Sequence, residues 1–155
     1  MGKKDISGLG FKSRAMTTFV QLVWASESIK ARLLGLLNKY GLTASQFGVL
    51  DALYHLGPQP QKSLGHHILK SGGNMTMVVD NLQKNGFVKR KRDEDDRRIM
   101  NVYITKKGEK LFSKIMPLHL KSVEEEMSGL SYEELEELGR LCVKLVVKQK
   151  EVVDM

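Results

Sequence analysis

The chain has only one cysteine, Cys142, among its 155 residues. A single thiol cannot form an internal disulfide, which agrees with a reducing compartment. The N-terminal MGKKDISG has no apolar segment behind its lysines, so we expect no secretory signal peptide. No uncharged run approaches the roughly 20 apolar residues of a membrane-spanning helix. These absences predict a cytoplasmic protein that does not enter a membrane.

The sequence also lacks the signatures of catalysis. We find no internal repeat, no nucleophile–base pattern and no cofactor fingerprint, and Ser-Gly-Gly at 71–73 is too short for a phosphate-binding loop. We therefore expect neither enzyme activity nor a cofactor. No two histidines stand four residues apart with a carboxylate or thiolate at ligand spacing, so no metal site is predicted. A phosphate contact by His66 or His67 fits these residues better; the other histidines are His55 and His119.

Positive charge is in excess, and it is unevenly placed. The net charge is +7 and the pI is about 9.5. Residues 1–120 hold 20 basic and 9 acidic residues, a net +11, whereas residues 121–155 hold 5 and 9, a net −4. A basic protein favours polyanions, nucleic acid first and an anionic membrane surface second. The pattern predicts a body that binds the polyanion and an acidic C-terminal segment that meets protein.

Helical periodicity dominates the first half of the chain. One long amphipathic helix is predicted over 11–40, and Gly41 ends it. TASQ at 43–46 is a capping-box pattern that predicts the start of a second helix. GPQP at 57–60 breaks that helix, and a short third helix follows. KSGG at 70–73 then predicts a tight turn.

The segment after this turn predicts a fourth helix and a β-hairpin. The helix is expected over 74–86, and Gly86 is a plausible residue to follow its C-cap. A strand starts at 87–88, a turn occupies 93–96, and a returning strand alternates over 98–105. The stripe expected to be buried on the helix consists of Met75, Val78, Val79 and Leu82.

Two more helices are predicted to close the chain. The first runs over 106–127 with an interruption near Pro117, and the second starts at SYEE, 131–134, another capping box. Cys142 lies on the apolar stripe of this last helix, which favours packing, for example at a dimer interface, over a redox switch. The stripe expected to face inward consists of Leu135, Leu138, Leu141, Leu145 and Val146.

Two helices joined by a tight turn and followed by a hairpin predict a winged helix-turn-helix over 43–105. The major groove of B-DNA admits one helix, and the preceding helix braces it. Asp80 would read a cytosine amino group or pair with a nearby arginine. Amides and hydroxyls can read base edges, methionine can touch a thymine methyl, and lysine can bind phosphate. The other outward residues expected to contact DNA are Asn74, Thr76, Met77, Asn81 and Lys84.

The hairpin tip, RKRDEDDRR at 90–98, is unusually charged. Like charges across a hairpin repel, which is a poor structural choice. An Asp two residues before an Arg can hold the guanidinium in one direction through a bidentate contact, and an arginine aimed in this way fits a narrow minor groove. The competing interpretation is a solvated hairpin that resists aggregation. The expected DNA-contacting set is Arg90, Arg92, Asp96, Arg97 and Arg98.

DDRRIMNVYITKKG at 95–108 resembles the wing signature of the MarR (multiple-antibiotic-resistance regulator) family. SGGNMTMVVDNLQKNGFVKR at 71–90 resembles the family's recognition helix and first wing strand, and LTASQFGVLDAL at 42–53 resembles its second helix. The resemblance covers roughly residues 15–148. The positions that fall on the wing signature are Asp96, Arg98, Val102, Ile104, Thr105 and Gly108.

This resemblance implies one mainly α domain, 1–155, in which helices at 11–40 and 106–150 dimerise beside the DNA-binding lobe. It implies a homodimeric regulator that reads a pseudo-palindrome through recognition helices about one DNA turn, roughly 34 Å, apart. Arg98 would enter the minor groove, with Asp96 orienting it, while Arg97 occupies a variable position. A small aromatic or phenolic effector would release a repressor. The residues that helix position suggests for its pocket are Phe19, Trp24, Phe47 and Met116.

Two other functions compete with this expectation. A constitutive architectural DNA-binding protein would bind with little sequence preference and ignore ligands. A pure protein-interaction module would show no salt-dependent DNA binding, which the charge distribution disfavours. The long flanking helices favour a regulated dimer, expected to be nucleoid-associated when bound.

Overall fold

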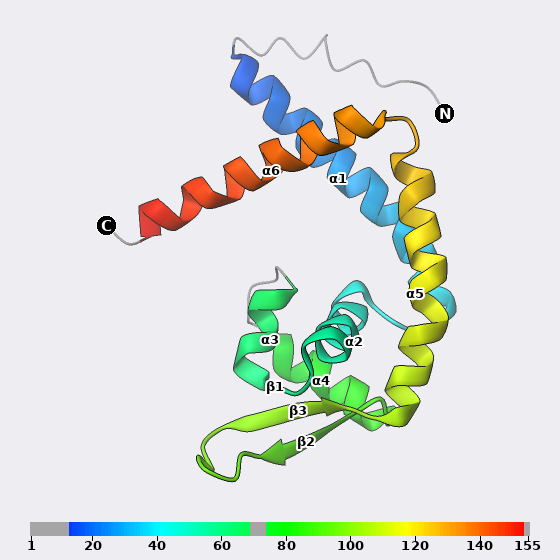
Figure 1. Ribbon diagram of the computed structural model, residues 1–155, viewed down its shortest axis with the longest axis vertical. Helices are drawn as coiled ribbons and strands as arrows, with labels where there is room; N and C mark the ends of the chain where they lie inside the picture. Colours follow the sequence, from blue (N-terminus) through cyan, green and yellow to red (C-terminus); the bar gives the residue numbers. More distant parts are fainter. Residues whose placement is uncertain (1–12, 69–73, 154–155) are drawn as a thin grey trace. The chain divides into compact units, whose positions relative to one another are not determined.

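A computed structural model describes residues 13–68 and 74–153 (Figure 1). These residues divide into two compact units between His119 and Leu120. Helix α5 (Lys106–Met127) continues from the first unit into the second, which α6 (Tyr132–Val153) completes. The predicted mainly α fold with a β-hairpin wing is confirmed. The other elements of the first unit are α1 (Arg14–Lys39), α2 (Ala44–Leu56), β1 (Gln59–Pro60), α3 (Gln61–His67), α4 (Met75–Lys84), β2 (Val88–Arg92) and β3 (Met100–Ile104).

Helix α2 begins at the predicted capping box. Thr43 Oγ1 accepts a hydrogen bond from the Gln46 backbone N–H at 3.2 Å, and Gln46 Oε1 accepts one from the Thr43 N–H at 2.8 Å. These two bonds satisfy two backbone donors that have no partner inside the helix. The same device starts α6, where Ser131 and Glu134 bond each other reciprocally. Both sequence predictions of a capping box are confirmed.

The core of the first unit lies where α2, α4 and the sheet meet. The buried α2 residues include Val49, Leu50 and Leu53, which are at most 1% exposed. The predicted stripe of α4 packs against this core: Met75, Val79 and Leu82 are buried, and Val78 is half-buried. Further buried side chains from the neighbouring elements are Leu37, Leu42, Leu64, Val88, Val102, Phe112 and Ile115.

The sheet has three antiparallel strands in the order β1-β3-β2, one more than the sequence predicted. GPQP ends α2 as expected, but Gln59 and Pro60 then pair with Val102 and Asn101 of β3. Pro60 is tolerated there because β1 is an edge strand, where a missing N–H costs no interior bond. The returning strand, predicted over 98–105, begins at Met100, because the chain before it belongs to the loop of the hairpin.

Helix α4 ends in a Schellman motif at Gly86. The Phe87 N–H bonds the Leu82 carbonyl and the Gly86 N–H bonds the Gln83 carbonyl, both at 2.9 Å. Gly86 has φ 75°, a left-handed conformation that a side chain disfavours. The predicted role of Gly86 is confirmed, and the motif turns the chain directly into β2.

The last two helices differ from the sequence prediction in two respects. Helix α5 runs unbroken through Pro117, so the predicted interruption is wrong. A proline removes one N–H donor and can bend a helix without ending it. The apolar stripe of α6 does not face inward in the single chain, because Leu135, Leu138, Leu141, Leu145 and Val146 are between 36% and 59% exposed.

The last two expectations concern the turn before α4 and the absence of membrane-spanning helices. The tight turn predicted at 70–73 lies outside the described residues. Over the ranges 13–68 and 74–153, no helix is both long enough and apolar enough to cross a membrane.

Candidate nucleic-acid interface

Helix α4 presents a polar face opposite its buried stripe. Met77 is 58% exposed, although it is a large apolar side chain. A methionine in that position can contact a thymine methyl, while the amides and hydroxyl beside it can read base edges. The residues predicted to contact DNA from this helix and its N-cap are all exposed: Asn74, Thr76, Met77, Asn81 and Lys84.

The wing loop, residues 93–99, is folded by the carboxylate of Asp93. One oxygen, Oδ1, accepts backbone N–H bonds from Asp95 at 3.0 Å and from Asp96 at 3.1 Å, and Oδ2 accepts the Asn101 amide at 2.8 Å. These bonds, above all the one from the Asp96 backbone, lower the pKa of Asp93 below its ordinary value. Backbone bonds between Asp93 and Ile99 and between Ile99 and Asp96 close the loop.

Arg98 is held outward at the end of this loop by Asp96. Arg98 Nε bonds Asp96 Oδ1 and Nη2 bonds Oδ2, each at 3.0 Å, and the Arg98 backbone N–H also bonds Oδ1. The predicted bidentate contact is therefore present, and the Arg98 side chain is 91% exposed. The contact lowers the pKa of Asp96 and raises the pKa of Arg98, so both groups stay charged. We call this pair the Asp96–Arg98 fork.

The remaining basic residues of the wing are arranged differently. Arg92 Nη1 bonds the Arg97 carbonyl across the loop at 3.0 Å, and both side chains are exposed. Arg90 points back into the protein instead, and its side chain is only 19% exposed. Its guanidinium pairs with Asp80 at 2.6 Å. Of the two roles that the sequence left open for Asp80, the structure shows the pairing with an arginine.

The base of the wing is joined to the start of α5 through Thr105 and Gly108. Thr105 Oγ1 accepts the Gly108 N–H at 3.1 Å and donates to the Gly86 carbonyl at 2.7 Å. A Cβ added to Gly108 would lie 2.2 Å from the Phe87 carbonyl oxygen. Lys107 extends the joint, because its Nζ bonds the Asn85 carbonyl at 2.8 Å. The Thr and Gly of the wing signature thus have a structural reason.

The four residues suggested for an effector do not line the pocket described in the first unit. Phe19 and Trp24 are exposed on α1, Met116 is half-buried, and Phe47 is buried with its ring 5.4 Å from that of Phe112 and 4.9 Å from that of His119. Their part in ligand binding stays a prediction.

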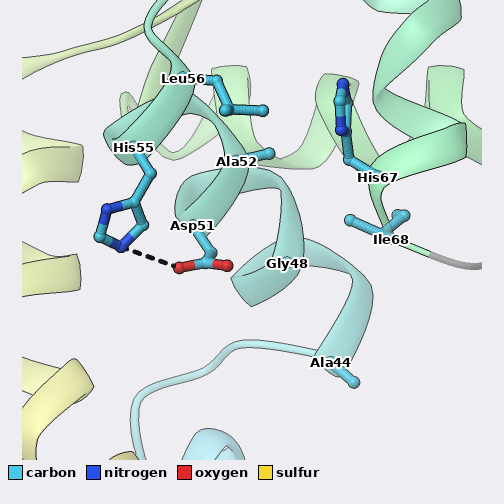
Figure 2. A pocket seen from close by; sticks show the side chains of 8 residues that line it. All are labelled: Ala44, Gly48, Asp51, Ala52, His55, Leu56, His67 and Ile68. Carbon is cyan, nitrogen blue, oxygen red and sulfur yellow. Dashed lines mark ion pairs between the residues drawn. The ribbon is translucent and has the colours of Figure 1, made fainter. Parts of the chain in front are cut away.

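A pocket of about 400 Å³ lies between α2 and the end of α3 (Figure 2). His55 and Asp51 form an ion pair at 3.3 Å on one side, and His67 lies across from them. Periodicity alone could not find this pocket, because it depends on how α2 crosses α3. No group of three metal-donor side chains comes together in the described part of the chain. The remaining lining residues are Ala44, Gly48, Ala52, Leu56 and Ile68.

Comparison with known proteins decides the family. A family model described as MarR family matches residues 42–100. The HTH-type transcriptional regulator MhqR of Bacillus subtilis is 35% identical over 133 residues, which is 86% of this chain and 89% of that protein. The chain belongs to the MarR family. A further relative from Bacillus subtilis, the uncharacterised HTH-type transcriptional regulator YkoM, is 34% identical over 131 residues, 84% of this chain and 85% of that protein.

Solved structures of other regulators share the fold. The organohalide-sensing regulator RdhR, solved with 2,4-dichlorophenol bound, has a TM-score of 0.79 and 18% identity, over 94% of this chain and 85% of its own. BpsR of Bordetella bronchiseptica, whose DNA binding is regulated by 6-hydroxynicotinic acid, has a TM-score of 0.76 and 22% identity, over 83% and 98%. As a MarR-family member, the chain is a DNA-binding transcriptional regulator with a winged helix-turn-helix.

Proposed function

We propose that this MarR-family regulator is a homodimeric, sequence-specific repressor that a small aromatic or phenolic ligand releases from DNA. The outer face of α4 reads the major groove and Arg98 enters the adjacent minor groove. The observation that carries the DNA-reading part is the Asp96–Arg98 fork, because it holds a 91% exposed guanidinium in one direction. A solvated wing that only resists aggregation does not need its arginine fixed in this way.

The fork is tested by Asp96→Asn, with Asp95→Asn as the matched control. Both substitutions remove one negative charge from the same loop, and charge alone predicts tighter DNA binding for both. The proposal predicts the opposite for Asp96→Asn, because Arg98 loses its bidentate partner. The measurement is the affinity for DNA upstream of the protein's own gene. Equal tightening by both variants would contradict the role given to the fork.

Two uncovered apolar stripes support a dimer. The α1 stripe includes Phe19, 60% exposed, and Trp24, 41% exposed, and the α6 stripe includes Leu145, 58% exposed. Contiguous apolar surface at helical spacing favours burial against another protein surface. Self-association through the flanking helices gives two copies of α4, which would read a pseudo-palindrome. Sedimentation at micromolar concentration tests this, and a stable monomer would contradict it.

The ligand part of the proposal rests on the two fold relatives. One was solved with a chlorinated phenol, and the other responds to a hydroxylated pyridine carboxylic acid. Both compounds are small, planar and hydroxylated. We therefore take this chemical class as the effector class for this chain, and 2,4-dichlorophenol and 6-hydroxynicotinic acid as its first probes.

The single tryptophan lets one titration test both release and location. A probe that binds beside Trp24 should quench the protein's intrinsic fluorescence at the concentration that releases DNA. Release without any change in fluorescence would place the ligand elsewhere, and the pocket beside Asp51 and His55 would be next, through Asp51→Asn. If neither probe nor a wider phenol series releases DNA, the constitutive architectural alternative gains support.

A further inference from the structure

Arg90 differs from every other arginine of the wing in how many internal acceptors it contacts. Its Nε donates to Gln61 Oε1 at 2.7 Å, Nη1 contacts Gln83 Oε1 at 3.2 Å and Asp80 Oδ1 at 2.6 Å, and Nη2 donates to the Thr76 carbonyl at 3.3 Å. One side chain of β2 therefore contacts both α3 and α4. Three of these contacts are hydrogen bonds from the guanidinium, and the contact with Asp80 is an ion pair.

Gln61 extends this network back to the DNA-facing helix. While its Oε1 accepts from Arg90, its Nε2 donates to Thr76 Oγ1 at 3.2 Å. The Thr76 hydroxyl therefore accepts from α3, which leaves its own hydrogen free to point at an acceptor. This chain of bonds links Arg90 to α4 and to Thr76, a residue expected to read DNA.

Asp80 gives the network an electrostatic role as well. It lies on the exposed side of α4, 56% exposed, among residues expected to face DNA. An unpaired carboxylate there would repel the phosphates of an approaching duplex. The Arg90 guanidinium at 2.6 Å neutralises that carboxylate without occupying the DNA-facing surface itself.

We propose that Arg90 is a positioning residue that holds α4 against α3 and the wing and neutralises Asp80, and that it does not itself contact DNA. This replaces the DNA contact expected from the sequence. The contrast with Arg98 supports it, because the Arg98 side chain is 91% exposed and Arg90 only 19% exposed. The proposal rests on the sequence-specific binding proposed above.

The test uses Arg90→Lys, which keeps the positive charge but lacks the planar guanidinium that contacts α3 and α4 together. Lys91→Gln is the control, since Lys91 is exposed on the same strand and its loss removes one charge. Affinities for upstream and scrambled DNA are measured across a salt series. Loss of a phosphate contact weakens binding to both DNAs about equally, and it lowers the slope of log affinity against log salt concentration by about 1.

The proposal predicts that Arg90→Lys lowers the preference for upstream over scrambled DNA by about tenfold or more, at an unchanged salt slope. Asp80→Asn should lower the preference in the same direction. The double variant should be no worse than Arg90→Lys alone, because both substitutions break the same network. Wild-type preference in Arg90→Lys, or strictly additive losses, would overturn the proposal.

Hydrogen exchange without DNA separates this proposal from the one on which it rests. Arg90→Lys should speed amide exchange in α4 and β2, whereas Lys91→Gln should leave it unchanged. If the wild type bound both DNAs equally, sequence-specific binding would be refuted. Amide exchange rates would still show whether Arg90 holds α4 in place. Unchanged exchange in Arg90→Lys would overturn the positioning role. Thermal melting identifies a variant that fails to fold, in which case Asp80→Asn carries the test.

Discussion

Gly108→Ala should damage the joint between the wing and α5, and its effect can be worked out from two opposing contributions. An added Cβ would lie 2.2 Å from the Phe87 carbonyl oxygen and 2.9 Å from Ile104 Cγ1. The oxygen belongs to the backbone of the wing and also accepts the Thr105 N–H, so it cannot move aside alone. Overpacking of this kind costs about 1–3 kcal/mol or more.

Helix propensity acts in the other direction. Alanine is favoured over glycine by about 1 kcal/mol inside a helix, and by less in a first turn such as the one that holds Gly108. The clash is the larger contribution, so we expect the free energy of unfolding to fall by about 1–2 kcal/mol. The melting temperature should fall by about 2–8 °C. The wing should shift with the joint, and DNA affinity should fall as well.

Gly35→Ala is the matched control for this prediction. Gly35 lies inside α1, and a Cβ there would have nothing within 4 Å. Only the propensity gain applies, so this variant should be as stable as the wild type or more stable by up to about 1 kcal/mol. Urea unfolding measures both variants. If Gly108→Ala were stabilised as much as Gly35→Ala, the close approach of Gly108 to the wing would be refuted.

Three further predictions concern the cap, the loop and a half-buried histidine ring. Thr43→Ala should lose about 1 kcal/mol of stability in urea unfolding while Thr43→Ser keeps most of it, because serine retains the bond to Gln46; equal losses would refute the cap. The loop amides bonded to Asp93 should shift in an NMR titration with a midpoint below 3.8, because hydrogen bonds from the loop backbone lower the pKa of Asp93. The stability that the Asp93 carboxylate gives the loop is lost only as pH falls through that lower pKa. A midpoint at or above 3.8 would contradict this. Burial lowers the pKa of His119 from 6.5, and the charge of Asp51 opposes this shift. The free energy of unfolding should therefore fall as pH drops below 6.5, and His119→Gln should remove this pH dependence. An unchanged slope of unfolding free energy against pH in the variant would exclude His119 as its source.

The parts of the site that sequence predicted are those governed by local spacing. The Asp96–Arg98 fork needs only a carboxylate two residues before a guanidinium, and the capping boxes need only a hydroxyl three residues before an acid or amide. The stripe of α4 follows from a period of 3.6 residues. In each case the partners are near in sequence, so their geometry follows from the local backbone.

The parts that sequence missed depend on long-range packing. Arg90 looked like another wing arginine, because the acceptors that surround it come from Gln61, Thr76 and Asp80 on two other helices. Strand β1 exists through its pairing with β3, which is distant in sequence. It has only two residues, which is too short to give a periodic pattern in the sequence. Pro117 was expected to interrupt α5, because proline has a low helix propensity. The helix runs through it, and helix propensity at one position does not show whether the turns on both sides hold together.

The most direct test of the account compares Arg98→Ala with Arg97→Ala in binding to upstream and scrambled DNA across a salt series. Arg97 is the neighbouring exposed arginine, so its loss controls for charge. The account predicts tight, salt-steep binding of the wild type to upstream DNA and a much larger loss of preference in Arg98→Ala than in Arg97→Ala. Equal, weak binding of all three proteins to both DNAs would leave only a basic surface and would contradict sequence-specific recognition by the wing.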